Sequence, residues 1–183
     1  MLIEYQCITI NTPEFEERRK RFSFLSKIHG WEISFWDAVD CRDLKESDYP
    51  SWASPNLKSG EVGIWWSTKN LYEYAIKKNL DFLFVFEDDT KIISSPAYEP
   101  QQNYDYVLFN DRPVGFDGYC VSKKGMKKLL DAFGPKNGAW CPIDIFVTGS
   151  PADYPDYVPD FENKTIEFMV KHDKIFKTSI QET

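Results

Sequence analysis

Residues 82–90, with the sequence Phe-Leu-Phe-Val-Phe-Glu-Asp-Asp-Thr, constrain the fold more than any other stretch of this chain. A run of five apolar residues predicts a strand that is buried on both faces. Three carboxylates, those of Glu87, Asp88 and Asp89, follow it directly. Because like charges repel, acids beside a buried strand need a divalent cation or cationic side chains nearby. We therefore predict a metal-binding strand end here, with an acidic surface loop as the alternative.

Length, composition and charge limit the class of protein. With 183 residues, 42% of them hydrophobic, the chain can bury one well-packed core. Its net charge of −7 argues against a nucleic-acid partner, because such proteins present broad electropositive surfaces. The sequence shows neither a signal peptide nor an apolar run of membrane-spanning length. We expect a soluble cytoplasmic protein whose four cysteines are mostly core residues, and we leave a disulfide and the oligomeric state open.

Hydrophobic periodicity predicts alternating strands and helices. Strands are predicted at residues 5–10, 31–39, 82–86, 104–109 and 119–121, and helices at 14–29, 60–79 and 123–133. Thr12 and Ser122 are expected to cap the first and the last of these helices. Because a strand-helix-strand order favours parallel strands joined by right-handed crossovers, we expect an α/β fold.

Several further polar residues lie where a site is expected. Asp111 follows the predicted strand at residues 104–109, so two strands should end in acids at one edge of the sheet. Asp144 lies inside an apolar run, where a carboxylate needs a partner or a chemical role. Gly115 and Gly118 permit a tight turn or a close approach to a ligand. His172, one of two histidines, is either structural or a ligand.

The basic cluster at residues 18–21 (Arg-Arg-Lys-Arg) has two interpretations. In the first, it is a solvated helix face paired with Glu14, Glu16 and Glu17 at helical spacing. In the second, one arginine reaches past the strand end toward a phosphate or a base.

Short stretches along the chain also match a known pattern in order and spacing. They are residues 8–11 (Ile-Thr-Ile-Asn), 17–19 (Glu-Arg-Arg), 36–40 (Trp-Asp-Ala-Val-Asp), 60–67 (Gly-Glu-Val-Gly-Ile-Trp-Trp-Ser), 84–89 (Phe-Val-Phe-Glu-Asp-Asp), 118–125 (Gly-Tyr-Cys-Val-Ser-Lys-Lys-Gly) and 142–144 (Pro-Ile-Asp). Together they resemble glycosyltransferase family 25, which includes lipopolysaccharide galactosyltransferases and procollagen galactosyltransferases.

The resemblance implies a GT-A-type fold, with a Rossmann-like, mostly parallel sheet flanked by helices. It implies a single domain over residues 1–183, with a nucleotide-binding half at 5–90 and an acceptor-side half at 91–183. It also implies a metal-dependent enzyme that moves a hexose, galactose or glucose, from a UDP-sugar to a glycan or a hydroxylated protein acceptor, with inversion.

The resemblance further implies roles for individual residues. Mn²⁺ or Mg²⁺ would be bound by Asp88, Asp89 and His172, because hard cations favour oxygen ligands and related enzymes complete the site with a histidine. Asp144 is the expected general base, with Asp111 in reserve. The donor-binding residues expected are Asn11, Arg18, Asp40, Glu87, Asp88, Gly115 and Gly118.

One position departs from the family pattern. Thr68 stands where members usually have a histidine. This departure suggests an alternative function, namely a catalytically silent carbohydrate- or protein-binding module that retains the fold.

Overall fold

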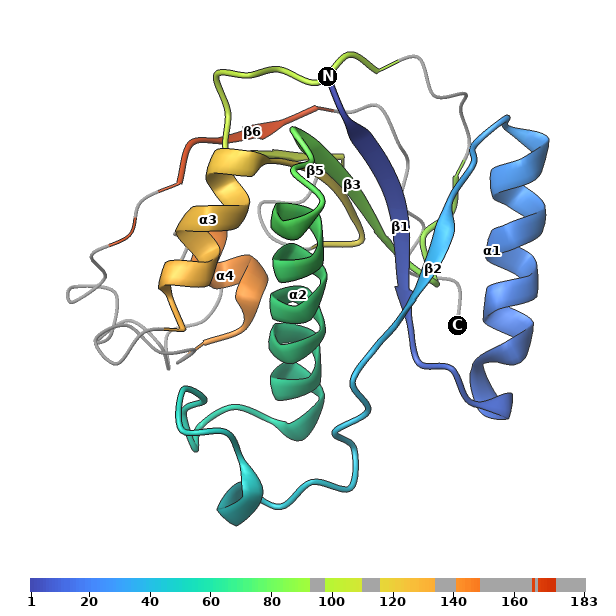
Figure 1. Cartoon of the computed structure of the whole chain (residues 1–183). Coiled ribbons are helices and arrows are strands. Elements are labelled where there is room, and N and C mark those ends of the chain that lie inside the picture. Colours follow the sequence, from blue (N-terminus) through green and yellow to red (C-terminus); the bar gives the residue numbers. More distant parts are fainter. Residues whose placement is uncertain (93–97, 110–115, 134–140, 149–165, 167, 174–183) are drawn as a thin grey trace.

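The computed structural model describes residues 1–92, 98–109, 116–133, 141–148, 166 and 168–173 (Figure 1). Its elements, in chain order, are β1 (Ile3–Thr9), η1 (Pro13–Phe15), α1 (Glu16–Ile28), β2 (Ser34–Asp37), η2 (Glu46–Asp48), α2 (Ser59–Lys77), β3 (Phe82–Glu87), β4 (Tyr106–Leu108), β5 (Gly118–Ser122), α3 (Lys123–Asp131), α4 (Ile143–Thr148) and β6 (Val170–His172).

The strands form one sheet in the order β2-β1-β3-β5-β4-β6. β1 pairs in parallel with β2 and β3, and β4 pairs in parallel with β6. Only β5 among these strands runs the other way, antiparallel to both of its neighbours. The short connection from β4 to β5 accounts for this reversal, since antiparallel neighbours need no crossover helix. The predicted α/β fold with a mostly parallel sheet is confirmed, and strands from both predicted halves share it.

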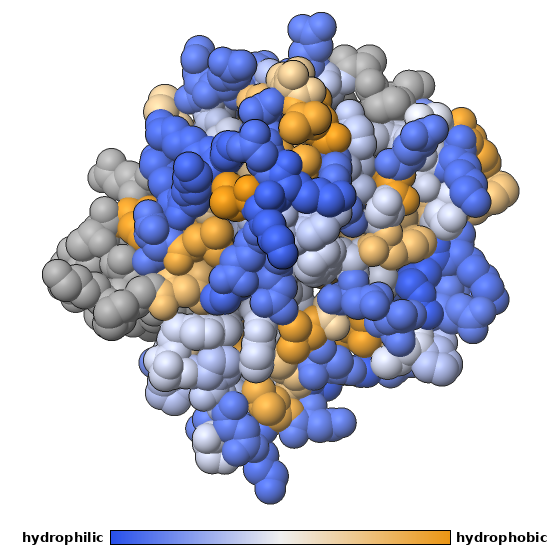
Figure 2. Space-filling model, viewed as in Figure 1, coloured by the Kyte–Doolittle hydropathy of each residue, from blue (hydrophilic) through white to orange (hydrophobic). Residues whose placement is uncertain are grey.

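The helices cover both faces of the sheet, so β3 is buried on both sides. Leu83 and Val85 belong to the core that α2, α3 and α4 make on one face. The phenylalanines that alternate with them belong to the core under α1, with Phe22 and Trp31. Figure 2 shows the outer surface over α2 and α3 as mostly hydrophilic, with small separate hydrophobic areas. Because successive residues of β3 face the two cores in turn, every residue from 82 to 86 is apolar.

The predicted starts of two helices and one strand can be compared with the structure. Ser122 caps α3 as predicted, because its hydroxyl accepts a hydrogen bond from the backbone N–H of Gly125. Thr12 does not act as a cap: its side chain makes no capping bond, and a 3-10 turn precedes α1. β2 begins later than predicted because Trp31 closes the preceding helix instead, donating its N–H to the carbonyl of Ser26. No helix within the described ranges is long and apolar enough to cross a membrane.

Close packing of α2 fixes the segment that follows β2. The carbonyl oxygen of Val39 lies 2.8 Å from where a β-carbon on Gly63 would be. Beside this contact, the Ser67 hydroxyl donates to the Gly63 carbonyl at 2.6 Å and accepts from the Val39 N–H at 2.8 Å. Gly63 therefore lets α2 approach this backbone directly.

Replacing Gly63 by alanine should lower the free energy of unfolding by about 1–3 kcal/mol, because the new methyl group meets a backbone carbonyl that cannot easily move. Gly60→Ala is the matched control in the same helix. Its added β-carbon meets nothing within 4 Å, so it should raise the free energy of unfolding by about 0.5–1 kcal/mol. Urea unfolding measures both, and equal effects of the two substitutions would contradict this packing argument.

Candidate functional site

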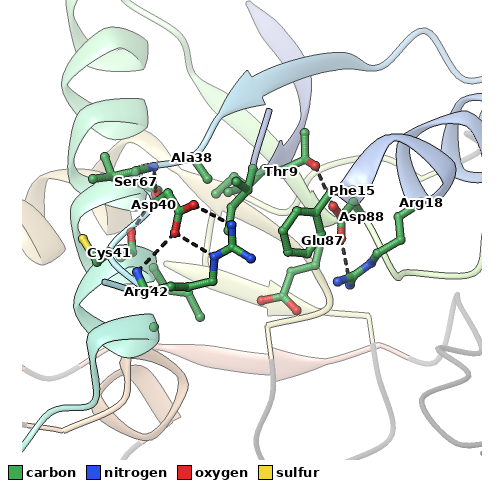
Figure 3. Close-up of a pocket in the computed structure, with 16 residues that line it drawn as sticks. Thr9, Phe15, Arg18, Ala38, Asp40, Cys41, Arg42, Ser67, Glu87 and Asp88 are labelled. Carbon is green, nitrogen blue, oxygen red and sulfur yellow. Dashed lines mark hydrogen bonds and ion pairs between the residues drawn. The ribbon is translucent and has the colours of Figure 1, made fainter. Parts of the chain in front are cut away.

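A cleft of about 200 Å³ lies at the carboxyl ends of β1 and β3 (Figure 3). It lies between α1, the segment that follows β2, and the start of α2. The residues that line it are Ile8, Thr9, Ile10, Phe15, Arg18, Ala38, Val39, Asp40, Cys41, Arg42, Gly60, Gly63, Ile64, Ser67, Glu87 and Asp88. The structure thus brings together four of the predicted site residues, namely Arg18, Asp40, Glu87 and Asp88.

Asp88 is the buried acid of the cleft, with only 8% of its surface exposed. The Thr9 hydroxyl donates to its Oδ2 at 2.6 Å, and Arg18 Nη2 lies 2.8 Å from its Oδ1. Thr9 is in place because Ile8 pairs with Glu87 in the parallel register of β1 and β3, so the next residues of the two strands are neighbours. Both carboxylate oxygens therefore have a partner, as a buried charge requires.

Asp89 also forms an ion pair with Arg18. Arg18 Nη2 lies 3.0 Å from Asp89 Oδ2, so one guanidinium nitrogen spans both aspartates. Burial raises the pKa of Asp89, and the charge of Arg18 acts in the opposite direction. With its side chain 40% exposed, Asp89 is the more accessible of the two carboxylates.

Glu87 lies between the two walls of the cleft, with Arg18 on one side and Arg42 on the other (Figure 3). Burial, followed by the charges of Asp89, Asp117 and Asp144, raises its pKa to about 8. Its backbone N–H donates to the carbonyl of Asp117 at 2.9 Å, which holds the strand end in place. A carboxyl group with such a pKa is protonated at neutral pH and can donate a hydrogen bond.

The opposite wall is built around Asp40. Arg42 donates to Asp40 Oδ1 from Nε at 2.9 Å and to Oδ2 from Nη2 at 2.7 Å, which lowers the pKa of Asp40. The same guanidinium donates to Glu14 at 2.6 Å. It lies 5.0 Å from the ring centre of Phe15, and the guanidinium of Arg18 lies 5.5 Å from that ring. Phe15 therefore separates the two arginines as a cation–π platform.

Asp144 lies in the first turn of α4, a short helix. Burial raises its pKa, and the charges of Asp117 and Glu61 add to the increase. Its charge also acts on Glu87, so the predicted base belongs to the electrostatic surroundings of the acidic strand end. A raised pKa suits a carboxylate that takes up a proton near neutral pH.

The other predicted residues lie elsewhere. Asn11 lines a separate groove between α1 and β2. At Gly118 a β-carbon would come 3.3 Å from the ring of Phe86, so packing on β3 accounts for that glycine. The backbone of His172 pairs with Leu108 at the far edge of the sheet, three strands and about 14 Å from β3. Asp111 and Gly115 lie outside the described residues.

Three cleft residues that contact its charged side chains were not anticipated, namely Thr9, Phe15 and Arg42. Thr9 could have been found from the sequence, because the last residue of the strand parallel to β3 must lie beside the acids. Phe15 and Arg42 carry no such signal. Their positions depend on the 3-10 turn before α1 and on the course of the segment after β2.

The carboxylates of Asp88 and Asp89 are close enough together to bind one cation. The guanidinium of Arg18 marks a position where a single cation is shared by both carboxylates. Within the described ranges, no three His, Cys, Asp or Glu side chains are grouped as ligands of one metal ion. This donor set suits ions such as Mg²⁺, which proteins commonly hold through one or two carboxylates together with phosphates of the substrate.

The pKa of Glu87 predicts how stability depends on pH. The folded protein keeps this proton up to about pH 8, whereas the unfolded chain releases it near the ordinary value of 4.5. Between these values unfolding releases a proton, so the free energy of unfolding falls as the pH rises. Glu87→Gln should remove on the order of 3 kcal/mol of this fall between pH 5 and pH 8.

Urea unfolding across this pH range measures the effect, with exposed Glu17→Gln as the control that should keep the wild-type slope. An unchanged slope in Glu87→Gln would show that Glu87 is already ionised at neutral pH.

The chain is similar to known proteins in two respects. Over 93% of each chain, the structure is similar to a glycosyltransferase involved in the glycosylation of the major capsid of PBCV-1, with 11% sequence identity and a TM-score of 0.44. Residues 6–96 match the family model described as "Glycosyltransferase family 25 (LPS biosynthesis protein)". Every residue that lines the cleft lies within this matched range. Residues 6–96, just under half of the chain, are therefore similar to glycosyltransferase family 25.

Proposed function

We propose that this chain is a metal-dependent glycosyltransferase that transfers a hexose, galactose or glucose, from a UDP-sugar to a hydroxyl group of a glycan or a hydroxylated protein. The observation that carries the proposal is the aspartate pair Asp88 and Asp89, which shares one cation beside the cleft. Ligands of open α/β sheets bind at the carboxyl ends of strands, which is where this pair lies.

The donor is proposed to bind with its diphosphate toward Asp88 and Asp89 and its nucleoside toward Asp40. Mn²⁺ or Mg²⁺ bound by the two aspartates would stabilise the negative charge that develops on the departing diphosphate. Glu87, when protonated, can donate a hydrogen bond to a hydroxyl or phosphate oxygen of the donor. Phe15, which lies near both arginines, offers an aromatic surface in the cleft.

The transfer itself requires a base on the acceptor side. In an inverting reaction the acceptor hydroxyl oxygen bonds to the anomeric carbon while the bond from that carbon to the diphosphate oxygen breaks. The hydroxyl proton passes to Asp144, and the bonding electron pair leaves with UDP. Asp144 is proposed for this role because its burial raises its pKa toward the working range. Asp111 remains the reserve candidate.

The reaction is proposed to occur in the cytoplasm. Support comes from Cys7, Cys41 and Cys120, which are buried free thiols. Free thiols persist in reducing compartments, whereas secreted domains of this size often form disulfides.

UDP binding measured by calorimetry tests the donor site. Wild-type protein should bind UDP in the presence of Mn²⁺, and Asp89→Asn should weaken this binding by at least about tenfold, because a charge-assisted contact is lost. Asp43→Asn removes the same charge from an exposed position and should leave binding unchanged. Tight UDP binding without any divalent cation would contradict metal dependence.

Release of UDP from UDP-galactose or UDP-glucose separates an enzyme from a silent binding module. Thr68, which suggested the module, is 1% exposed and is not among the residues that line the cleft. We therefore expect turnover, and Asp144→Asn should lower it by about 100-fold or more while donor affinity stays within twofold, as expected for loss of a general base. Donor binding with UDP release at background in the wild type would favour the module.

A further inference from the structure

We propose that Arg18 is an internal counter-ion of Asp88 and Asp89. In the free protein its guanidinium occupies the position between the two carboxylates, and a divalent ion takes this position when a nucleoside diphosphate binds. The competition between Arg18 and the ion follows from the aspartate pair alone. The second part, the exchange on nucleotide binding, rests on the function proposed above.

Arg18 occupies the position that a shared metal ion would need. A single nitrogen, Nη2, contacts Asp88 Oδ1 at 2.8 Å and Asp89 Oδ2 at 3.0 Å. The second oxygen of Asp88 is bound to Thr9, so Oδ1 is the oxygen left for a cation. An ion bound by both carboxylates would need the position that this nitrogen occupies. Two positive charges cannot share it, because like charges at contact distance repel strongly.

Arg18 is free to move away from the two carboxylates. The Arg18 side chain is 42% exposed and projects from the surface of α1, so it can leave the carboxylates without disturbing the core. Its neighbour Arg19 differs, since its guanidinium donates to the backbone carbonyls of Ile10 and Thr12. Arg42 is tied to Asp40 and Glu14 on the opposite wall. Arg18 is thus the cleft arginine whose partners are the acids proposed to take a metal.

A displaced Arg18 has a second position available within the cleft. Its guanidinium already lies 5.5 Å from the ring of Phe15 inside the cleft. A short rotation keeps it at the cleft and turns it toward bound phosphate, for which an arginine is well suited. The nucleotide would then favour metal binding by drawing Arg18 away, and by reciprocity the metal would favour nucleotide binding.

Manganese binding without nucleotide tests the competition, with free Mn²⁺ followed by its electron paramagnetic resonance signal. Arg18→Gln keeps a hydrogen-bond donor for Asp88 but removes the competing charge, so Mn²⁺ should bind on the order of tenfold more tightly than to the wild type. Arg21→Gln, an exposed arginine on the same helix, controls for the loss of long-range charge and should match the wild type. In the presence of Mn²⁺, Arg18→Gln should bind UDP on the order of tenfold more weakly than the wild type.

The outcomes separate the two proposals. Equal Mn²⁺ affinity in the wild type and Arg18→Gln, or no Mn²⁺ binding by either, overturns the counter-ion role. Tighter Mn²⁺ binding by Arg18→Gln together with no UDP binding by any form keeps the competition and rejects the donor site. Thermal unfolding checks that the variant folds. If it does not, Arg18→Lys replaces it. The lysine side chain is shorter and its ammonium is more strongly hydrated, so it should compete less well for the bridging position and raise Mn²⁺ affinity by a smaller factor of about threefold.

Discussion

The carboxylate of Asp88, buried at the end of the central strand, is the interaction on which the site depends. A buried charge without partners would cost several kcal/mol, and here Thr9 from β1 and Arg18 from α1 supply them. These two contacts connect the neighbouring strand and the first helix to one point at the sheet edge. The stability of this edge and the chemistry of the cleft therefore depend on the same atoms.

The architecture explains why acids can collect there. β3 is buried on both faces, so its carboxylates can only emerge at its end, where α1 and the segment after β2 leave a cleft. Burial raises the pKa of Glu87 to about 8, and the negative charges of the nearby aspartates add to this increase. The three consecutive acids consequently differ: Glu87 holds a proton, Asp88 is buried and paired, and Asp89 faces outward.

The acids of the cleft could be predicted from the sequence, but the residues that surround them could be predicted only in part. The apolar run before the acids predicted the position of β3 and of Asp88, and the resemblance to the family added Arg18 and Asp40, which line the same cleft. Part of the basic cluster is the solvated helix face of the first interpretation, because Lys20 pairs with Glu16 and Glu17. Arg18 reaches the acids at the strand end, and the phosphate or base of the second interpretation stays a prediction. Asn11 missed the cleft because the residue after a strand end can turn to either side. Phe15 and Arg42 depend on loop geometry, which periodicity does not encode.

Anomalous diffraction from a crystal grown with UDP and Mn²⁺ tests whether Asp88 and Asp89 bind the metal, because it locates the metal independently of the protein. We expect one manganese peak between the carboxylates of Asp88 and Asp89, in contact with the diphosphate, with the guanidinium of Arg18 moved off both aspartates. A manganese peak elsewhere, or nucleotide bound in the cleft with Arg18 still bridging the pair, would contradict it.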